Sequence, residues 1–242
     1  MKSNTHISVI IPVFNEEKLI TACLDALSKQ TRQPDTIYIV DNNSTDTTVR
    51  IAQKYKHVVI IKESVQGICA AAKTGLDEAA LNDGILLRCD ADSRPPYDWL
   101  EKVEATFNGS SEIIAVTGPG VPYGVPKLLK TLFGFFYMKP YFVFVGLALG
   151  NTPLFGSNFA IRAETWRAVS SETHLATHQD IHDDIDISYH IRDFGRTFYD
   201  PSLQMPISAR PFRSLPKMIV RYKIGFKSIF IHWPEQAPWK RR

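Results

Sequence analysis

The feature that most constrains the fold is a set of short apolar runs that alternate with helical segments in the first ninety residues. The apolar runs, each expected to form a strand, are residues 7–11, 37–40, 57–61 and 85–89. The segments between them, expected to form helices, are residues 16–29, 47–55 and 67–80. Continuous apolar runs are typical of strands buried on both faces of a parallel sheet. We therefore predict an α/β fold with a mainly parallel central sheet flanked by helices, which binds ligands at the carboxyl ends of its strands.

Acidic residues stand at the ends of two of these predicted strands. Asp41 ends the second run, and Asp90 and Asp92 follow the fourth run in the triplet DAD. Side chains alternate along an extended chain, so Asp90 and Asp92 project to the same side and can address one ligand. Two nearby carboxylates repel each other unless a cation accompanies them, and Mg²⁺ or Mn²⁺ bridging to a diphosphate meets that need. An acid-rich surface turn is the alternative for the triplet taken alone.

Six sequence blocks occur in an order that resembles the family 2 glycosyltransferases with the GT-A fold. They lie between residues 7 and 200 and read SVIIPVFNEE, IVDNNSTDTT, GICAAAKTGLDEA, RCDADSRPP, FGSNFAIR and HDDIDISYHIRDFG. The resemblance implies a glycosyltransferase catalytic domain over residues 1–205. It also implies inverting transfer of a sugar from a nucleotide-diphospho-sugar donor, with Mg²⁺ or Mn²⁺ as cofactor.

The resemblance further implies roles for individual residues on the donor side. The residues expected to bind the donor are Pro12, Phe14, Asn15, Glu16, Asp41, Lys73, Asp90 and Asp92. Within this set Asp41 would contact the base, Asp90 the ribose, and Asp92 the metal ion that neutralises the diphosphate. Lys73 would reach the donor phosphates, and a solvated helix lysine is the equal alternative.

The segment HDDIDISYHIRDFG predicts a helix that begins near Asp183 and ends at Gly195. Acids at a helix start are favoured by the helix dipole whether or not they do chemistry, so capping is one explanation of Asp183 and Asp184. The resemblance implies instead that Asp184 is the general base that deprotonates an acceptor hydroxyl. It places Asp183 in a supporting position on the acceptor side, where the family has Glu.

The block FGSNFAIR supplies two more acceptor-side predictions. Its Gly turn brings the backbone close to a ligand, which makes Asn158 and Arg162 candidate contacts, with a structural ion pair as the alternative for Arg162. The QxxRW motif of processive synthases is not found after residue 195, which favours transfer of a single sugar. In its place stands PISARPFRS, in which Arg210 or Arg213 could cap the donor phosphates or face solvent or membrane.

Three histidines, His174, His178 and His182, recur at four-residue intervals beside several acids. This spacing superficially resembles a transition-metal cluster. The loop-like sequence around them favours surface histidines instead, with His182 a neighbour of the base or a third metal ligand.

The net charge of +3 conceals an asymmetry along the chain. Residues 206–242 hold nine Lys or Arg and only Glu235, a local charge of +8 that leaves −5 for the rest. Within this C-terminal extension, residues 215–233 follow the pattern of a basic amphipathic helix. An anionic membrane surface is the expected partner, because no nucleic-acid-binding module is recognisable.

Residues 128–149 are the most apolar stretch of the chain. Lys130, Lys139 and Pro140 interrupt it, so its pieces are predicted to be shorter than the roughly 20 residues that span a membrane. Membrane contact, an acceptor-binding groove and ordinary burial stay open for this stretch. Three cysteines without CxxC spacing favour core positions and a reducing compartment. The first apolar run is too short for a signal peptide. We therefore expect a cytoplasmic protein, peripheral at the inner face of the cell membrane.

Together these observations predict metal-dependent transfer of one sugar to an acceptor hydroxyl on a membrane-associated lipid or glycan. A polyprenyl-phosphate glycosyl synthase is the nearest alternative, because there a lipid phosphate replaces the hydroxyl and no strong base is needed. A non-catalytic nucleotide-sugar-binding or membrane scaffold protein is the alternative from another class.

Overall fold

The computed structural model of the chain describes residues 5–210 and 214–240. Its strands are β1 (Ile7–Val13), β2 (Thr36–Asp41), β3 (Val58–Lys62), β4 (Ile85–Arg88), β5 (Ile113–Thr117), β6 (Gly120–Tyr123), β7 (Phe159–Arg162), β8 (Arg196–Tyr199) and β9 (Met205–Ser208). Its α-helices are α1 (Ile20–Ser28), α2 (Thr48–Ala52), α3 (Ile68–Ala79), α4 (Trp99–Gly109), α5 (Lys127–Phe133), α6 (Gly146–Leu149), α7 (Ala163–Val169), α8 (Asp183–Ile191) and α9 (Leu215–Phe230). Shorter helical turns are η1 (Gly134–Met138), η2 (Tyr141–Val145), η3 (His174–Ala176) and η5 (Pro238–Lys240).

The described strands form one large sheet in the order β3-β2-β1-β4-β7-β5-β8, and β6 pairs with β9 in a small second sheet. Every neighbouring pair in the large sheet is parallel except the two pairs made by β7. The four predicted strands are all present, and β1 is buried along its whole length, as its uninterrupted apolar sequence predicts. The mainly parallel α/β architecture predicted from the sequence is thus confirmed.

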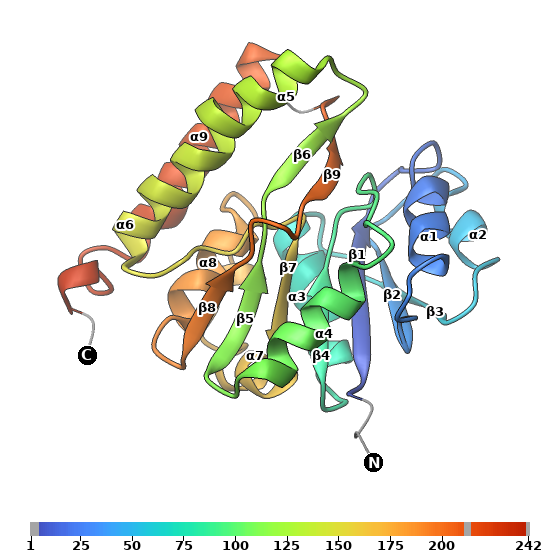
Figure 1. The fold of residues 1–242 in the computed structure, drawn as a ribbon, viewed down its shortest axis with the longest axis horizontal. Coiled ribbons are helices and arrows are strands. Elements are labelled where there is room, and N and C mark those ends of the chain that lie inside the picture. The colour runs from blue at the N-terminus through green and yellow to red at the C-terminus, as the bar shows by residue number, and fades with distance from the viewer. Residues whose placement is uncertain (1–4, 211–213, 241–242) are drawn as a thin grey trace.

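Helices cover both faces of the large sheet (Figure 1). Side chains of α1 and α4 join one hydrophobic cluster, and those of α3 and α7 join the other. In α3, a Cβ on Gly75 would lie 2.5 Å from Ile10 and 2.6 Å from Val40, so only glycine lets this helix lie so close to the sheet. The three cysteines are buried and unpaired, as predicted.

The sheet reverses its strand order between β1 and β4. Strands β1, β2 and β3 follow one another outward in one direction, whereas β4 lies on the other side of β1. The connections on either side of such a switch point diverge and leave a crevice at the carboxyl ends of the two strands. Asp90 and Asp92 follow β4 directly, so the topology places the DAD triplet at the mouth of this crevice.

The apolar stretch differs from its prediction. Residues 127–149 form one continuous helix of 23 residues, here called the apolar helix, in which α5, η1, η2 and α6 follow one another through Pro140. Wider π-helical turns flank the proline, and such turns accommodate a residue that cannot donate a regular hydrogen bond. The prediction of short pieces is therefore wrong. By length and composition this helix could cross a membrane: its most apolar 18 residues have a mean hydropathy of 1.6, and 11% of them are buried.

The apolar helix lies beside α9, and the two form a layer above the carboxyl end of the sheet (Figure 1). Tyr137 of the apolar helix meets Tyr222 of α9 with ring centroids 6.4 Å apart. The predicted basic helix is thus present as α9. The predicted boundary between a catalytic domain and an extension at residue 205 stays a prediction, and β9 crosses that position.

Candidate active site

A cavity of about 560 Å³ opens at the carboxyl ends of β1 and β4. Its acidic side chains gather where the segment after β4 meets the start of α8. The cavity residues that come from the predicted donor and base motifs are Pro12, Phe14, Glu16, Asp90, Asp92, Asp183 and Asp184. The fold therefore gathers acids from three separate sequence blocks around one space.

Arg88, the last residue of β4, lies beneath these acids and is only 3% exposed. Its Nη2 lies 3.1 Å from Asp90 Oδ1 and 3.4 Å from Asp183 Oδ2. Burial alone would lower the pKa of this guanidinium, but Asp183 and Asp90 hold it well above the ordinary value. Arg88 is therefore a permanent positive charge that lets buried carboxylates stand together.

Asp183 is the more buried of the two acids at the start of α8. Burial, opposed by Arg88 and reinforced by Asp184, raises the pKa of Asp183 to about 6. The chain thus holds Asp183 against a guanidinium at the wall of the cavity. This geometry suits the supporting position predicted for it.

Asp184 projects from the first turn of α8 to the boundary of the cavity. Its Oδ2 accepts a hydrogen bond of 2.6 Å from the Gly156 amide and lies 3.3 Å from the Tyr141 hydroxyl. A side chain at residue 156 would collide with the Arg88 guanidinium and approach Asp184 Oδ2 to 3.1 Å, so this position requires glycine. A carboxylate fixed in this way on a rigid helix is suited to accept a proton.

Asp92 stands with Glu16 at the outer side of the cavity, and Arg210 bridges them. Arg210 Nη2 lies 3.0 Å from Asp92 Oδ2 and 2.9 Å from Glu16 Oε1. Burial and the neighbouring Asp90 raise the pKa of Asp92, and the Arg210 guanidinium opposes this rise. Carboxylate oxygens are the ligands that Mg²⁺ and Mn²⁺ prefer, so these residues fit the predicted metal.

Asn15 and Asp41, predicted to touch the donor directly, shape the loop after β2. Asn15 Oδ1 accepts a hydrogen bond of 2.8 Å from the Thr45 amide, and Asp41 Oδ1 accepts one of 3.0 Å from the Ser44 amide. The neighbouring residue Asn42 lines the cavity instead of Asp41. Their contact with a nucleotide stays a prediction.

Three residues predicted to contact the donor or the acceptor, Lys73, Asn158 and Arg162, do not line the cavity. Lys73 Nζ is 2.6 Å from Asp77 Oδ2, because α3 presents it to its own following turn and to α7. Asn158 is fully buried and accepts a 2.9 Å bond from Trp99 Nε1, so it joins the sheet to α4.

Arg162 ends β7, which is antiparallel to β4 and so carries it to the opposite end of the sheet. There its Nε donates to Ile113 O at 2.8 Å, and the guanidinium covers the Phe107 ring. It is a structural residue.

The histidines also divide between two places. His182 lines the cavity, as predicted for a neighbour of the base, and its Nε2 lies 3.1 Å from Arg221 O. His174 points away from the cavity toward Asp186, with 2.7 Å between Nδ1 and Oδ1. The spacing of four residues in the sequence therefore does not bring His174, His178 and His182 together.

Sequence reasoning missed Arg88, Tyr141 and Arg221 as site residues, whereas the Gly turn of FGSNFAIR, at Gly156, does lie at the cavity. A charged residue that ends an otherwise apolar strand, as Arg88 ends ILLR, was the available signal. Tyr141 and Arg221 come from helices whose placement only the tertiary structure reveals. Of the two arginines predicted to cap phosphates, Arg210 reaches the cavity and Arg213 lies outside the described residues.

A second cavity, of about 450 Å³, adjoins the first beneath the apolar helix and α9. Its walls are mostly apolar, and Tyr137, Phe144 and Phe226 are among them. Asp184 and Arg221 line both cavities. The Asp184 carboxylate thus stands where a more polar space meets an apolar one.

Comparison with known proteins agrees with this geometry. The model of the family described as Glycosyl transferase family 2 matches residues 8–163. Glycosyltransferase AglE of Haloferax volcanii is 33% identical over 128 residues, which are 50% of this chain and 41% of AglE. Poly(ribitol-phosphate) beta-glucosyltransferase of Bacillus spizizenii is 43% identical over 137 residues, 50% of this chain and 21% of that protein. The chain spans less than half the length of these relatives.

Among solved structures, mannosyltransferase PcManGT from Pyrobaculum calidifontis, in complex with GDP-Man and Mn²⁺, has a TM-score of 0.71. The match covers 94% of this chain and 63% of that chain at 20% sequence identity. The likeness concerns the fold, and it confirms the GT-A class predicted from the sequence.

Proposed function

The chain belongs to glycosyl transferase family 2, and from this premise we propose that it transfers one sugar from a nucleotide-diphospho-sugar to an acceptor carried by a membrane lipid. The polar cavity at the switch point supports the donor half, because its acids lie where nucleotides bind in open α/β sheets. The observation that carries the acceptor half is the adjoining apolar cavity, whose wall includes Asp184.

In this proposal Asp184 takes the proton from an acceptor hydroxyl, and the acceptor oxygen attacks the anomeric carbon of the donor. The bond from that carbon to the diphosphate oxygen breaks, the nucleoside diphosphate leaves, and the configuration inverts. The hydrogen bond from Gly156 keeps Asp184 oriented. Burial raises the pKa of Tyr141, so its hydroxyl stays protonated beside the base.

Asp92 would hold Mg²⁺ or Mn²⁺, with Asp90 and Glu16 beside it. The ion would neutralise charge on the departing diphosphate. The Mn²⁺ in the PcManGT complex supports this assignment. Arg210 occupies the position of a cation between Glu16 and Asp92, so we expect it to turn to the donor phosphates when donor and metal enter.

Metal dependence is the first test. Chelation with EDTA, or the variant Asp92→Asn, should each lower sugar transfer by about 10²–10³-fold, because one main source of transition-state charge stabilisation is lost. Mn²⁺ or Mg²⁺ should restore the chelated wild type but not the variant. The exposed acid Asp83 pairs with Arg167 outside the cavity, so Asp83→Asn is the control and should keep full activity. Full transfer in EDTA would contradict the metal assignment.

The lipid could instead present a phosphate, as in a polyprenyl-phosphate glycosyl synthase. Arg221, at the junction of the two cavities, favours this second candidate because guanidinium groups bind phosphate well. The deciding assay offers the same donor with polyprenyl phosphate in one arm and a lipid-linked sugar with free hydroxyls in the other. Turnover in neither arm, with donor binding intact, would favour the non-catalytic binding or scaffold protein.

The surface above the two cavities supports a proposal of membrane contact. The apolar helix exposes Phe135, Phe136 and Phe144, each at least 59% exposed, and α9 exposes Phe226 and Phe230. Lys130 and Lys139 stand among these side chains at the surface. Aromatic groups flanked by cations are typical of helices that lie in a membrane interface. We therefore propose a peripheral position at the inner face of the cell membrane, with the acceptor entering from the lipid.

Membrane binding can be measured by sedimentation with vesicles that contain anionic lipid. The triple variant Phe135→Ser, Phe136→Ser and Phe144→Ser should lower the bound fraction at least about tenfold, because each buried aromatic contributes roughly 1.5–3 kcal/mol. Leu81→Ser removes a side chain that is 76% exposed and follows α3, and it should change nothing. Equal vesicle binding by the triple variant would show that the apolar helix does not meet the membrane.

A further inference from the structure

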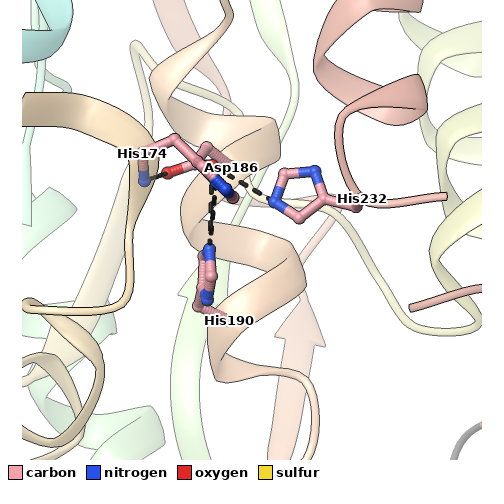
Figure 2. A group of neighbouring side chains, drawn as sticks. All are labelled: His174, Asp186, His190 and His232. Carbon is pink, nitrogen blue, oxygen red and sulfur yellow. Dashed lines mark hydrogen bonds and ion pairs between the residues drawn. The ribbon is translucent and has the colours of Figure 1, made fainter. Parts of the chain in front are cut away.

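Three histidine rings converge on one buried carboxylate on the side of α8 away from the cavity (Figure 2). Asp186 is fully buried, and it lies two residues after Asp184, roughly 200° around the helix. His190 lies on the same face one turn later. His174 comes from η3, and His232 follows α9, so distant parts of the chain meet here.

The distances are those of a ligand set. Asp186 Oδ1 lies 2.7 Å from His174 Nδ1, 3.2 Å from His232 Nε2 and 3.7 Å from His190 Nε2. Oδ2 of the same carboxylate accepts a hydrogen bond of 2.9 Å from the His174 amide, which fixes its orientation. One candidate ligand atom from each of the four residues lies within 4.8 Å of the others. Bonds of about 2.0–2.1 Å in a tetrahedron place ligand atoms roughly 3.3 Å apart, so small shifts complete the geometry.

The surroundings of His232 are a second, independent observation that points to a cation site. Its ring is fully buried and stacks on Tyr189, with 4.1 Å between the ring centroids. Nδ1 donates to Ser228 O at 2.7 Å, so neutral His232 presents a lone pair at Nε2. That atom lies 3.2 Å from Asp186 Oδ1, a contact that is an ion pair only with a protonated ring, and it makes no other polar contact among the described residues. A proton on Nε2 or a metal ion between the two groups would satisfy both of them, and the two further imidazoles around the same carboxylate oxygen favour the metal ion.

The chemistry of the four groups selects the ion. Three imidazoles with one carboxylate are typical of zinc-type cations, whereas Mg²⁺ prefers oxygen ligands. We propose that His174, Asp186, His190 and His232 bind one Zn²⁺-type ion at a closed structural site separate from Asp92.

This ion would hold α9 against α8. His232 follows α9 directly, and α9 carries Arg221 to the junction of the two cavities. A metal–ligand bond at His232 therefore fixes the helix that forms the outer wall of the acceptor cavity. Metal–ligand bonds at this site would attach the layer of the apolar helix and α9 to α8 and η3.

The test is zinc binding by the full chain, purified with a tag that contains no histidine, stripped with EDTA and assayed in excess Mg²⁺. We expect one Zn²⁺ per chain by elemental analysis, a Zn²⁺-dependent rise in melting temperature, and the visible spectrum of four-coordinate Co²⁺ after substitution. His190→Gln and His232→Gln should each weaken Zn²⁺ binding at least about tenfold. His178→Gln, which removes a histidine beside the cluster but outside it, is the matched control.

Asp92→Asn should keep the bound Zn²⁺, since it alters only the oxygen-rich site. Absence of stoichiometric Zn²⁺ in the wild type, unchanged affinity in both histidine variants, or loss of Zn²⁺ in Asp92→Asn would each overturn the proposal. If either variant fails to fold by circular dichroism, His174→Gln at the more exposed edge of the cluster replaces it, and the Co²⁺ spectrum of the wild type remains decisive.

Discussion

Replacing Asp184 with Asn is expected to lower turnover of a hydroxyl acceptor by about 10³-fold, within the 10²–10⁴ that a positioned general base contributes. The amide oxygen of Asn can still accept the hydrogen bond from Gly156, so the local fold should persist. The amide cannot accept the acceptor proton, and the loss should therefore fall on kcat. Single-turnover sugar transfer, together with calorimetric binding of the donor in Mn²⁺, separates this loss from weaker donor binding.

The same variant distinguishes the two acceptor classes. A phosphate acceptor is ionised at neutral pH and needs no base, so Asp184→Asn should keep most of its activity if polyprenyl phosphate is the true acceptor. Asp83→Asn again serves as the control, because this exposed acid lies outside both cavities. Wild-type turnover of a hydroxyl acceptor by Asp184→Asn would remove the carboxylate from the mechanism.

Local sequence was sufficient for the part of the site that depends on strand ends. Asp90 and Asp92 follow a buried strand, and parallel strands bring their carboxyl ends to one edge, so the donor side could be predicted without tertiary information. Glu16, after the first strand, reaches the same edge for the same reason. The order of the motifs then led to Asp184 at the start of α8 as the proposed base.

Strand direction and helix continuity could not be predicted in this way. An apolar strand has the same pattern whether it runs parallel or antiparallel, and Arg162 was misplaced because β7 runs against β4. The apolar helix was divided at Pro140 because a proline normally ends a helix, whereas π-helical turns on both sides let it continue. An acceptor-binding groove in this stretch was accordingly only one of three open possibilities, and the cavity under the helix is its proposed counterpart.

Clusters built from distant residues were also beyond the sequence. His174, His190 and His232 meet because α8 and the segment after α9 pack together, and the even spacing of His174, His178 and His182 suggested a different set. Arg88 and Asp183 are nearly a hundred positions apart, and their contact decides how the buried acids are tolerated. Spacing predicts neighbours within one element, and packing alone reveals those between elements.

Arg88→Met is expected to destabilise the protein by about 3–5 kcal/mol near pH 8, because removal of one partner leaves buried carboxylates without a counter-charge. Methionine has a similar length, so lost packing is a smaller contribution. Arg88→Lys keeps the charge but cannot reach Asp90 and Asp183 with a planar fork, and it should lose less. Urea unfolding at several pH values measures both variants.

The sign of the pH dependence tests the cause of this destabilisation. Asp183 has a pKa of about 6 in the folded protein and an ordinary value of 3.8, so the folded state holds its proton more tightly than the unfolded state. Its contribution to stability is therefore present at low pH and is lost as the pH rises from about 3.8 to 6.

Without Arg88 the pKa of Asp183 in the folded protein rises further, and the loss of stability should continue above pH 6. The difference between Arg88→Met and wild type should thus shrink as the pH falls from 8 to 5, because a protonated Asp183 needs no counter-charge. A difference that is constant over this range would assign the role of Arg88 to packing instead of charge.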